Sequence, residues 1–161
     1  MEIERKFLID ENQLPENLSE YPHKELEQAY IITEPVLRIR KKNQDYILTY
    51  KGPGLMKREE VEFPLSGEAY EKLLAKTDGN IITKTRYEIP EKQNLTIELD
   101  VFHGVFQGLF LAEVEFSSEA DALSYLPPNW FGREVTKTHT FHNSNLSQMK
   151  EEDISKLLQS I

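Results

Sequence analysis

Charged and apolar residues alternate along most of this chain with a period of two residues. In the opening segment Glu2, Glu4 and Lys6 fall on one side and Ile3 on the other, because successive side chains of a strand point to opposite faces. Short connections containing turn-forming residues predict antiparallel neighbours. The alternation predicts eight strands, at about residues 2–9, 26–33, 36–42, 45–51, 57–64, 80–89, 95–102 and 109–117.

Three other segments have the pattern of helices. The first begins at Ser66, a residue type that often caps a helix N-terminus, and runs to about Lys76. The second follows Ser118 over about 119–125 and ends before a proline pair. The third covers about 147–160, where apolar residues form one stripe. No linker or repeat divides the chain, so we expect a single domain over residues 1–161.

The charges on the predicted strands are sorted by sign. Arg38 and Arg40 share one strand, whereas Glu98 and Asp100 share another. An antiparallel sheet with one solvated face also alternates, but such a face usually mixes both signs with other polar residues. We therefore expect an α+β fold: an eight-stranded, closed antiparallel barrel with a charged interior and helices packed outside.

The composition excludes several kinds of protein. A net charge of −9 argues against a general nucleic-acid binder, whose surface is normally basic. The absence of cysteine excludes disulfides and thiolate chemistry. No segment approaches the roughly 18 apolar residues of a membrane-spanning helix, and no signal-peptide pattern opens the chain. We expect a cytoplasmic protein without membrane or nucleic-acid partners.

A charged interior of this kind predicts an anionic ligand carrying several phosphates. Lysine and especially arginine donate hydrogen bonds to phosphate oxygens. Carboxylates would repel phosphate, so they require a hard cation such as Mg²⁺ or Mn²⁺ between them. The basic candidates are Lys6, Arg38, Arg40, Lys51, Arg58, Lys84 and Arg86, and the acidic candidates are Glu2, Glu4, Glu60, Glu62, Glu98, Asp100, Glu113 and Glu115.

The opening Glu2-Ile3-Glu4-Arg5-Lys6 resembles the signature of the CYTH superfamily, the triphosphate tunnel metalloenzymes, and in particular its small bacterial-type inorganic triphosphatases. Later segments resemble family segments in the family's order, so that the resemblance extends to about residue 146. They are Gln28-Ala29-Tyr30, Leu37-Arg38-Ile39-Arg40, Leu48-Thr49-Tyr50-Lys51, Arg58-Glu59-Glu60-Val61-Glu62, Lys84-Thr85-Arg86-Tyr87, Ile97-Glu98-Leu99-Asp100, Ala112-Glu113-Val114-Glu115 and Gly132-Arg133-Glu134-Val135-Thr136.

The resemblance implies a tunnel that binds a triphosphate through its basic residues and a divalent metal through glutamates. It places metal ligands at Glu2, Glu4 and Glu115 and phosphate contacts at the seven basic candidates. The remaining acidic candidates would serve a second metal or its bound waters. Tyr30 resembles a tunnel-facing tyrosine of some relatives, with a buried core aromatic as the alternative.

Lys84, coupled to Lys51, is the candidate general base, because neighbouring cations lower the pKa of a lysine. A plain phosphate ligand is the alternative role for Lys84. The four histidines form no metal-binding spacing, and we expect His139 and His142 at the surface.

The predicted activity is metal-dependent hydrolysis of inorganic tripolyphosphate to pyrophosphate and phosphate, with water attacking in line. The alternatives are a class IV type adenylyl cyclase, a thiamine or nucleoside triphosphatase, and a non-catalytic polyphosphate- or nucleotide-binding module. An adaptor role would rest on the amphipathic tail at 154–161. The sequence leaves a homodimer open.

Overall fold

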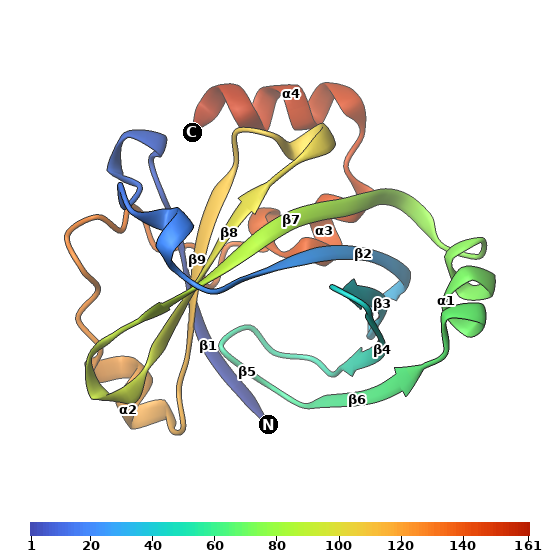
Figure 1. The fold of residues 1–161 in the computed structure, drawn as a ribbon, viewed down its shortest axis with the longest axis horizontal. Helices are drawn as coiled ribbons and strands as arrows, with labels where there is room; N and C mark the ends of the chain where they lie inside the picture. The colour runs from blue at the N-terminus through green and yellow to red at the C-terminus, as the bar shows by residue number, and fades with distance from the viewer.

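A computed structural model describes residues 1–161 as one strongly curved antiparallel sheet with helices on its outside (Figure 1). The strands are β1 (Glu2–Leu8), β2 (His23–Thr33), β3 (Val36–Lys42), β4 (Asp45–Lys51), β5 (Lys57–Arg58), β6 (Glu60–Leu65), β7 (Asp78–Pro90), β8 (Thr96–Phe102) and β9 (Phe110–Glu115). The helices are α1 (Gly67–Leu74), α2 (Glu119–Ser124), α3 (Asn143–Gln148) and α4 (Glu151–Ser160), with short 3-10 turns in the connections. No helix is both long and apolar enough to cross a membrane.

The sheet curls until its two edges are joined by a single residue. Its strand order is β5-β1-β9-β8-β7-β2-β3-β4-β6, so the edge strands β5 and β6 are consecutive in the chain and only Glu59 separates them. The loop before β5 depends on Gly54, which has φ +125° and where an added Cβ would lie 2.1 Å from the Lys57 carbonyl oxygen. The result is a nearly closed barrel.

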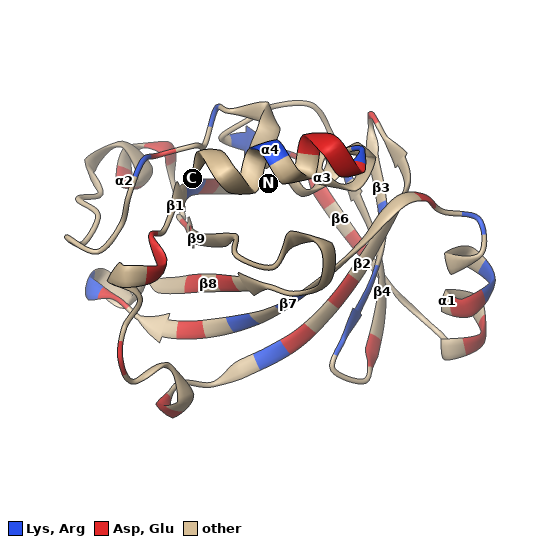
Figure 2. Cartoon of the chain, turned by 90° about the horizontal axis from the view of Figure 1, so that it is seen from above, with Lys and Arg blue, Asp and Glu red and all other residues tan.

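The predicted barrel is confirmed, but its strand count differs from the expected eight. The segment predicted as one strand at 57–64 forms two, because β5 pairs with β1 and β6 pairs with β4 on the other side of the closure. A single strand could pair with one neighbour on each side, but here the residues that pair with β1 end at Arg58 and those that pair with β4 begin at Glu60, so Glu59 belongs to neither strand. The alternation itself is visible as charged bands along β7, β8 and β2 (Figure 2).

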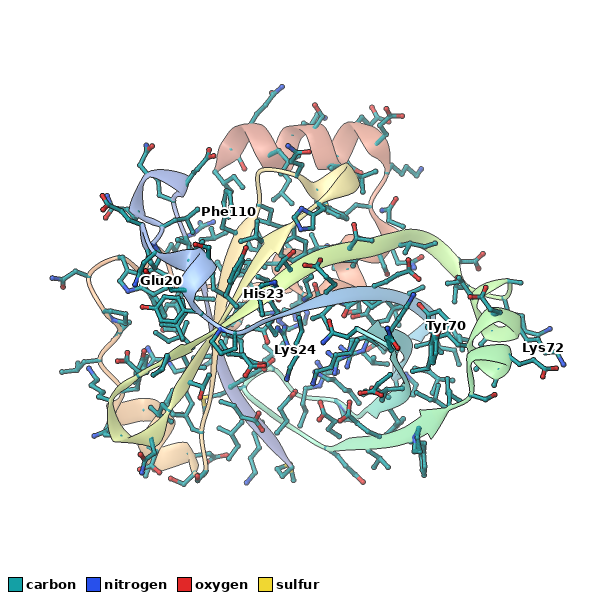
Figure 3. All side chains as sticks on the ribbon, in the orientation of Figure 1. Glu20, His23, Lys24, Tyr70, Lys72 and Phe110 are labelled. Atoms are coloured by element: carbon teal, nitrogen blue, oxygen red, sulfur yellow. The ribbon has the colours of Figure 1, made fainter.

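Three apolar clusters stabilise the barrel. One joins the outer faces of β1, β8 and β9 to α2. A second lies under α1, where Tyr70 points toward the sheet (Figure 3) and donates a 2.8 Å hydrogen bond to Glu27. The third lies partly inside, because Phe102 and Leu111 stand opposite Lys84 and Asp100 on the inner face of the sheet. One end of the interior is therefore apolar, which the alternation did not predict.

The helix starts at Ser66 and Ser118 are confirmed, since each side chain accepts a hydrogen bond from the backbone three residues later. The single helix predicted at 147–160 is wrong. The chain forms α3 and α4 instead, with extended backbone at Met149 and Lys150. The Asn80 side-chain amide of β7 donates to the carbonyls of Leu146 and Met149, at 3.0 and 2.9 Å. These bonds satisfy carbonyls at the end of α3, so the helix can stop there.

Candidate active site

The barrel encloses a polar cavity of about 210 Å³. Side-chain nitrogens gather in the space bounded by β2, β3 and β4 (Figure 3). Tyr30, Val36 and Leu55 are the only hydrophobic residues in its lining. A cavity this rich in charge is suited to an ionic ligand and unsuited to an apolar one.

Inward-facing positions of many different strands bring the predicted residues together. All candidates except Asp100 line the cavity: Glu2, Glu4, Lys6, Tyr30, Arg38, Arg40, Lys51, Arg58, Glu60, Glu62, Lys84, Arg86, Glu98, Glu113 and Glu115. Asp100 is fully buried beneath the wall, where its carboxylate accepts from Arg86 at 2.7 and 2.8 Å and from Lys84 at 2.6 Å. The structure therefore places Asp100 as a charge partner of these two cations.

Many cations of the cavity are neutralised by carboxylates of other strands. Besides the Asp100 pairs, Lys6 lies 3.5 Å from Glu113, and Lys51 lies 2.9 Å from Glu2 and 3.4 Å from Glu60. Partly buried pairs of this kind hold long side chains in fixed positions. Their cations can bind an incoming anion only in competition with these carboxylates.

The β3 wall differs because its cations are largely unpaired. Arg38 forms no ion pair and donates only to the Thr49 hydroxyl, at 3.3 Å. Arg40 has one long contact of 3.5 Å to Glu62. Lys42 lines the cavity beyond Arg40 with no carboxylate partner. Burial, together with Arg38 and Arg86, lowers the pKa of Arg40 to about 10. The cations of this strand outnumber their carboxylate partners, and a bound anion would relieve that excess of positive charge.

An excess of negative charge occurs around Glu4. Burial and the neighbouring Glu113 and Glu2 raise the pKa of Glu4 to about 8. Glu4 also stands directly opposite Glu115 in the β1–β9 ladder, and like charges in that position are destabilising. Burial and Glu2 raise the pKa of Glu115 as well.

These carboxylates fit a hard divalent cation by donor chemistry and by charge. Glu2, Glu4 and Glu115 would hold it, with Glu113 next to them on the cavity wall. No three acidic or histidine side chains already converge on one point.

Lys84 is the most deeply buried cation that reaches the cavity, with 1% of its side chain exposed. Burial lowers the pKa of Lys84 to about 8, against the opposing effect of Asp100. Its ammonium also lies 5.1 Å from the centre of the Phe102 ring. A lysine held in this way can lose its proton near neutral pH.

Sequence reasoning missed several lining residues. Lys42 continues the inward alternation of Arg38 and Arg40 and could have been found from that pattern. Thr136, His142, Asn143 and Ser144 come from the segment before and within α3, whose position depends on tertiary packing.

The expectation that His142 lies at the surface is wrong, because it is half-buried in the cavity wall. Burial and nearby Lys6 lower the pKa of His142 to about 4, so the ring is neutral near pH 7. Its Nε2 lies 3.2 Å from the Thr136 carbonyl oxygen. A carbonyl can only accept, so Nε2 carries the hydrogen.

Comparison with known proteins gives a consistent family assignment. The model of the CYTH domain matches residues 1–151. The chain belongs to the CYTH domain family. An inorganic triphosphatase of Nitrosomonas europaea is 38% identical over 156 residues, which cover 91% of this chain and 96% of that protein. An inorganic triphosphatase of Acetivibrio thermocellus is 34% identical over 150 residues, or 90% of this chain and 92% of its own.

The solved structures agree with the CYTH assignment. The crystal structure of an inorganic triphosphatase superposes with a TM-score of 0.69 and 35% sequence identity, over 93% of this chain and 96% of that one. The family match includes the whole sheet and α3, so the charged cavity lies within the CYTH domain.

Proposed function

We propose that this protein is a hydrolase of inorganic triphosphate, which it cleaves to pyrophosphate and orthophosphate with the help of a divalent metal ion. The observation that carries this proposal is the division of one cavity into a strand of largely unpaired cations, β3, and a carboxylate cluster around Glu4. A linear polyanion complexed with a divalent cation would neutralise both regions, because the anion balances the β3 cations and the metal ion balances the carboxylates. The two relatives above align with this chain over nearly their full length, and both are inorganic triphosphatases, which supports the same substrate.

The β3 cations would bind the phosphate chain. Arg38 and Arg40 each present a planar guanidinium that can donate two hydrogen bonds to phosphate oxygens. Lys6, Lys51, Arg58 and Arg86 surround the same space from other strands. Phosphoryl transfer depends mainly on positioning and charge neutralisation, which this arrangement supplies.

Glu2, Glu4 and Glu115 would hold Mg²⁺ or Mn²⁺. Such an ion neutralises developing charge on the phosphate oxygens when it is bound. The carboxylates fix its place in the cavity, and their repulsion from phosphate keeps the chain on the β3 side.

Lys84 is our candidate for the group that takes a proton from the attacking water. Its pKa of about 8 leaves a minor neutral fraction at pH 7, and Asp100 fixes its amine at the cavity wall. Lys51, which lines the same cavity, is the partner proposed for it, and Tyr30 is 3% exposed and reaches that cavity as well. A hydroxyl in that position can orient phosphate or water.

The test is a product panel on purified protein with tripolyphosphate, ATP, GTP and thiamine triphosphate, each with Mg²⁺, with Mn²⁺ and with a chelator. We expect orthophosphate and pyrophosphate from tripolyphosphate, and loss of turnover on chelation. The Glu4→Gln variant should lose metal-dependent turnover, whereas Glu16→Gln, at an exposed loop position, should keep it.

The main competing activity is adenylyl cyclisation, in which the ribose hydroxyl replaces water as nucleophile at the α phosphorus. Cyclic AMP as the principal product from ATP would favour the cyclase and contradict the hydrolase. Binding of tripolyphosphate without turnover under any metal would instead favour a non-catalytic binding module.

A further inference from the structure

Four buried polar atoms without a hydrogen-bond partner lie on two neighbouring strands. They are both amide atoms of Gln28, on β2, and the Nε atoms of Arg38 and Arg40, on β3. Almost all buried polar groups in proteins find a partner, so each exception needs an explanation. Only one other side-chain atom in the protein, Oδ1 of Asn143, is buried in the same unpartnered state.

The β2–β3 ladder brings Gln28 and Arg40 together. They are directly opposite each other in the register, so their side chains point to the same face of the sheet with Cβ atoms roughly 5 Å apart. Arg40 lines the cavity, which means that Gln28 also points inward.

Gln28 nevertheless does not reach the cavity surface. It is 0% exposed, and on its other side it stands opposite Ile82, a member of the interior apolar cluster. Gln28 therefore lies behind the arginines, at the boundary between the charged and apolar layers of the barrel.

The two arginines lack a hydrogen-bond partner at Nε. Each has a terminal nitrogen in a long contact, 3.3 Å to Thr49 for Arg38 and 3.5 Å to Glu62 for Arg40. The Nε–H of each has no acceptor. A guanidinium is planar, and a hydrogen bond at Nε would fix its orientation while leaving both terminal nitrogens free to donate to phosphate oxygens as a fork.

We infer that Gln28 is a positioning residue for triphosphate binding. When the phosphate chain draws Arg40 away from Glu62, the Gln28 side-chain oxygen accepts a hydrogen bond from Arg40 Nε, directly or through one buried water. The amide thus acts through the arginine and never touches the substrate. This inference rests on the proposed function, because it needs a phosphate chain at the β3 wall.

The first test separates stability from binding by replacing the amide with apolar side chains of similar size, in Gln28→Met and Gln28→Leu. An unpartnered buried amide destabilises the empty protein, and an apolar replacement removes that cost. We expect the melting temperature without ligand to be unchanged or higher. Melting temperatures lower than wild type in both variants would mean that the amide is already satisfied, and would overturn the inference.

The same variants should bind tripolyphosphate about tenfold more weakly, the effect of one hydrogen bond to a charged group. Calorimetry in chelator measures binding without turnover, and KM with Mg²⁺ measures it in the working enzyme. Gln107→Met, at an exposed turn position, is the matched control and should bind as wild type does. Wild-type affinity in both Gln28 variants would overturn the positioning role.

A double-mutant cycle tests whether Gln28 acts through Arg40. Arg40→Lys keeps the charge but removes the Nε–H of the guanidinium, so adding Gln28→Met to it should cause no further loss of affinity. A full tenfold additional loss would overturn the inference. Wild-type protein that binds no tripolyphosphate under either condition would contradict the proposed function, whereas wild-type binding with unaffected Gln28 variants contradicts only this inference.

Discussion

Lys84 combines three properties: near-complete burial, a carboxylate partner at 2.6 Å and access to a cavity that other cationic side chains also line. Burial lowers its pKa to about 8. Since a general base must be neutral before it accepts a proton, the active fraction of the enzyme should increase as the pH rises toward and past that value.

We predict that kcat for tripolyphosphate rises between pH 7 and 9, and that Lys84→Arg lowers kcat by at least about 100-fold with a small change in KM. Arginine keeps the positive charge but is not deprotonated in this range. Steady-state kinetics across pH provide the measurement. Lys6→Arg, the same exchange at a second buried lysine, is measured for comparison. A Lys84→Arg enzyme with near-normal kcat would mean that Lys84 is only a phosphate ligand.

Among the elements, β3 is the strand on which the cations are least compensated. Its inward positions are Val36, Arg38, Arg40 and Lys42, and its outward position Lys41 lies 6.0 Å from the Tyr46 ring on the other face. Burial, with Lys24 and Arg40 nearby, lowers the pKa of Lys42. Two adjacent lysines on one strand thus point to opposite faces of the sheet.

This difference gives a matched pair of variants. Lys42→Ala should raise KM for tripolyphosphate about fivefold, the effect of losing about 1 kcal/mol at a partly exposed charge, with little change in kcat. Lys41→Ala should leave both constants unchanged, because its side chain faces away from the cavity. Equal effects of the two substitutions would show that the charge of β3 acts at long range rather than by contact.

The whole molecule keeps many charges inside a closed sheet, an arrangement that costs free energy unless each charge is paired. The β3 cations and the Glu4–Glu115 pair remain partly uncompensated by the protein's own side chains. A ligand that neutralises them should therefore stabilise the native state as a whole.

We predict that tripolyphosphate at about 100 times its dissociation constant raises the melting temperature by about 5–10 °C, corresponding to about 2.7 kcal/mol for a domain of this size. Thermal unfolding in chelator, where turnover is prevented, would measure it. Orthophosphate at the same concentration should produce a much smaller shift, since it spans only part of the β3 wall. An equal shift with both anions would contradict binding of an extended chain.

The alternation of residues determined much of this structure by itself. A strand exposes every second side chain to one face, so Glu2, Arg38 and Lys84 had to lie on the charged side of their strands wherever the sheet was placed. The N-caps at Ser66 and Ser118 were also predictable from the sequence, because a cap is a contact between residues three positions apart.

Only the tertiary structure decided how the sheet closes and which side chains lie buried behind its charged face. Segment 57–64 divides at Glu59 because the residues before it pair with β1 and those after it pair with β4, and α3 ends where Asn80 from β7 reaches its carbonyls. Asp100 and Gln28 belong to the charged face by alternation, yet neighbouring side chains bury both completely. Local periodicity gives the direction of a side chain, whereas its depth and partners depend on residues distant in the sequence.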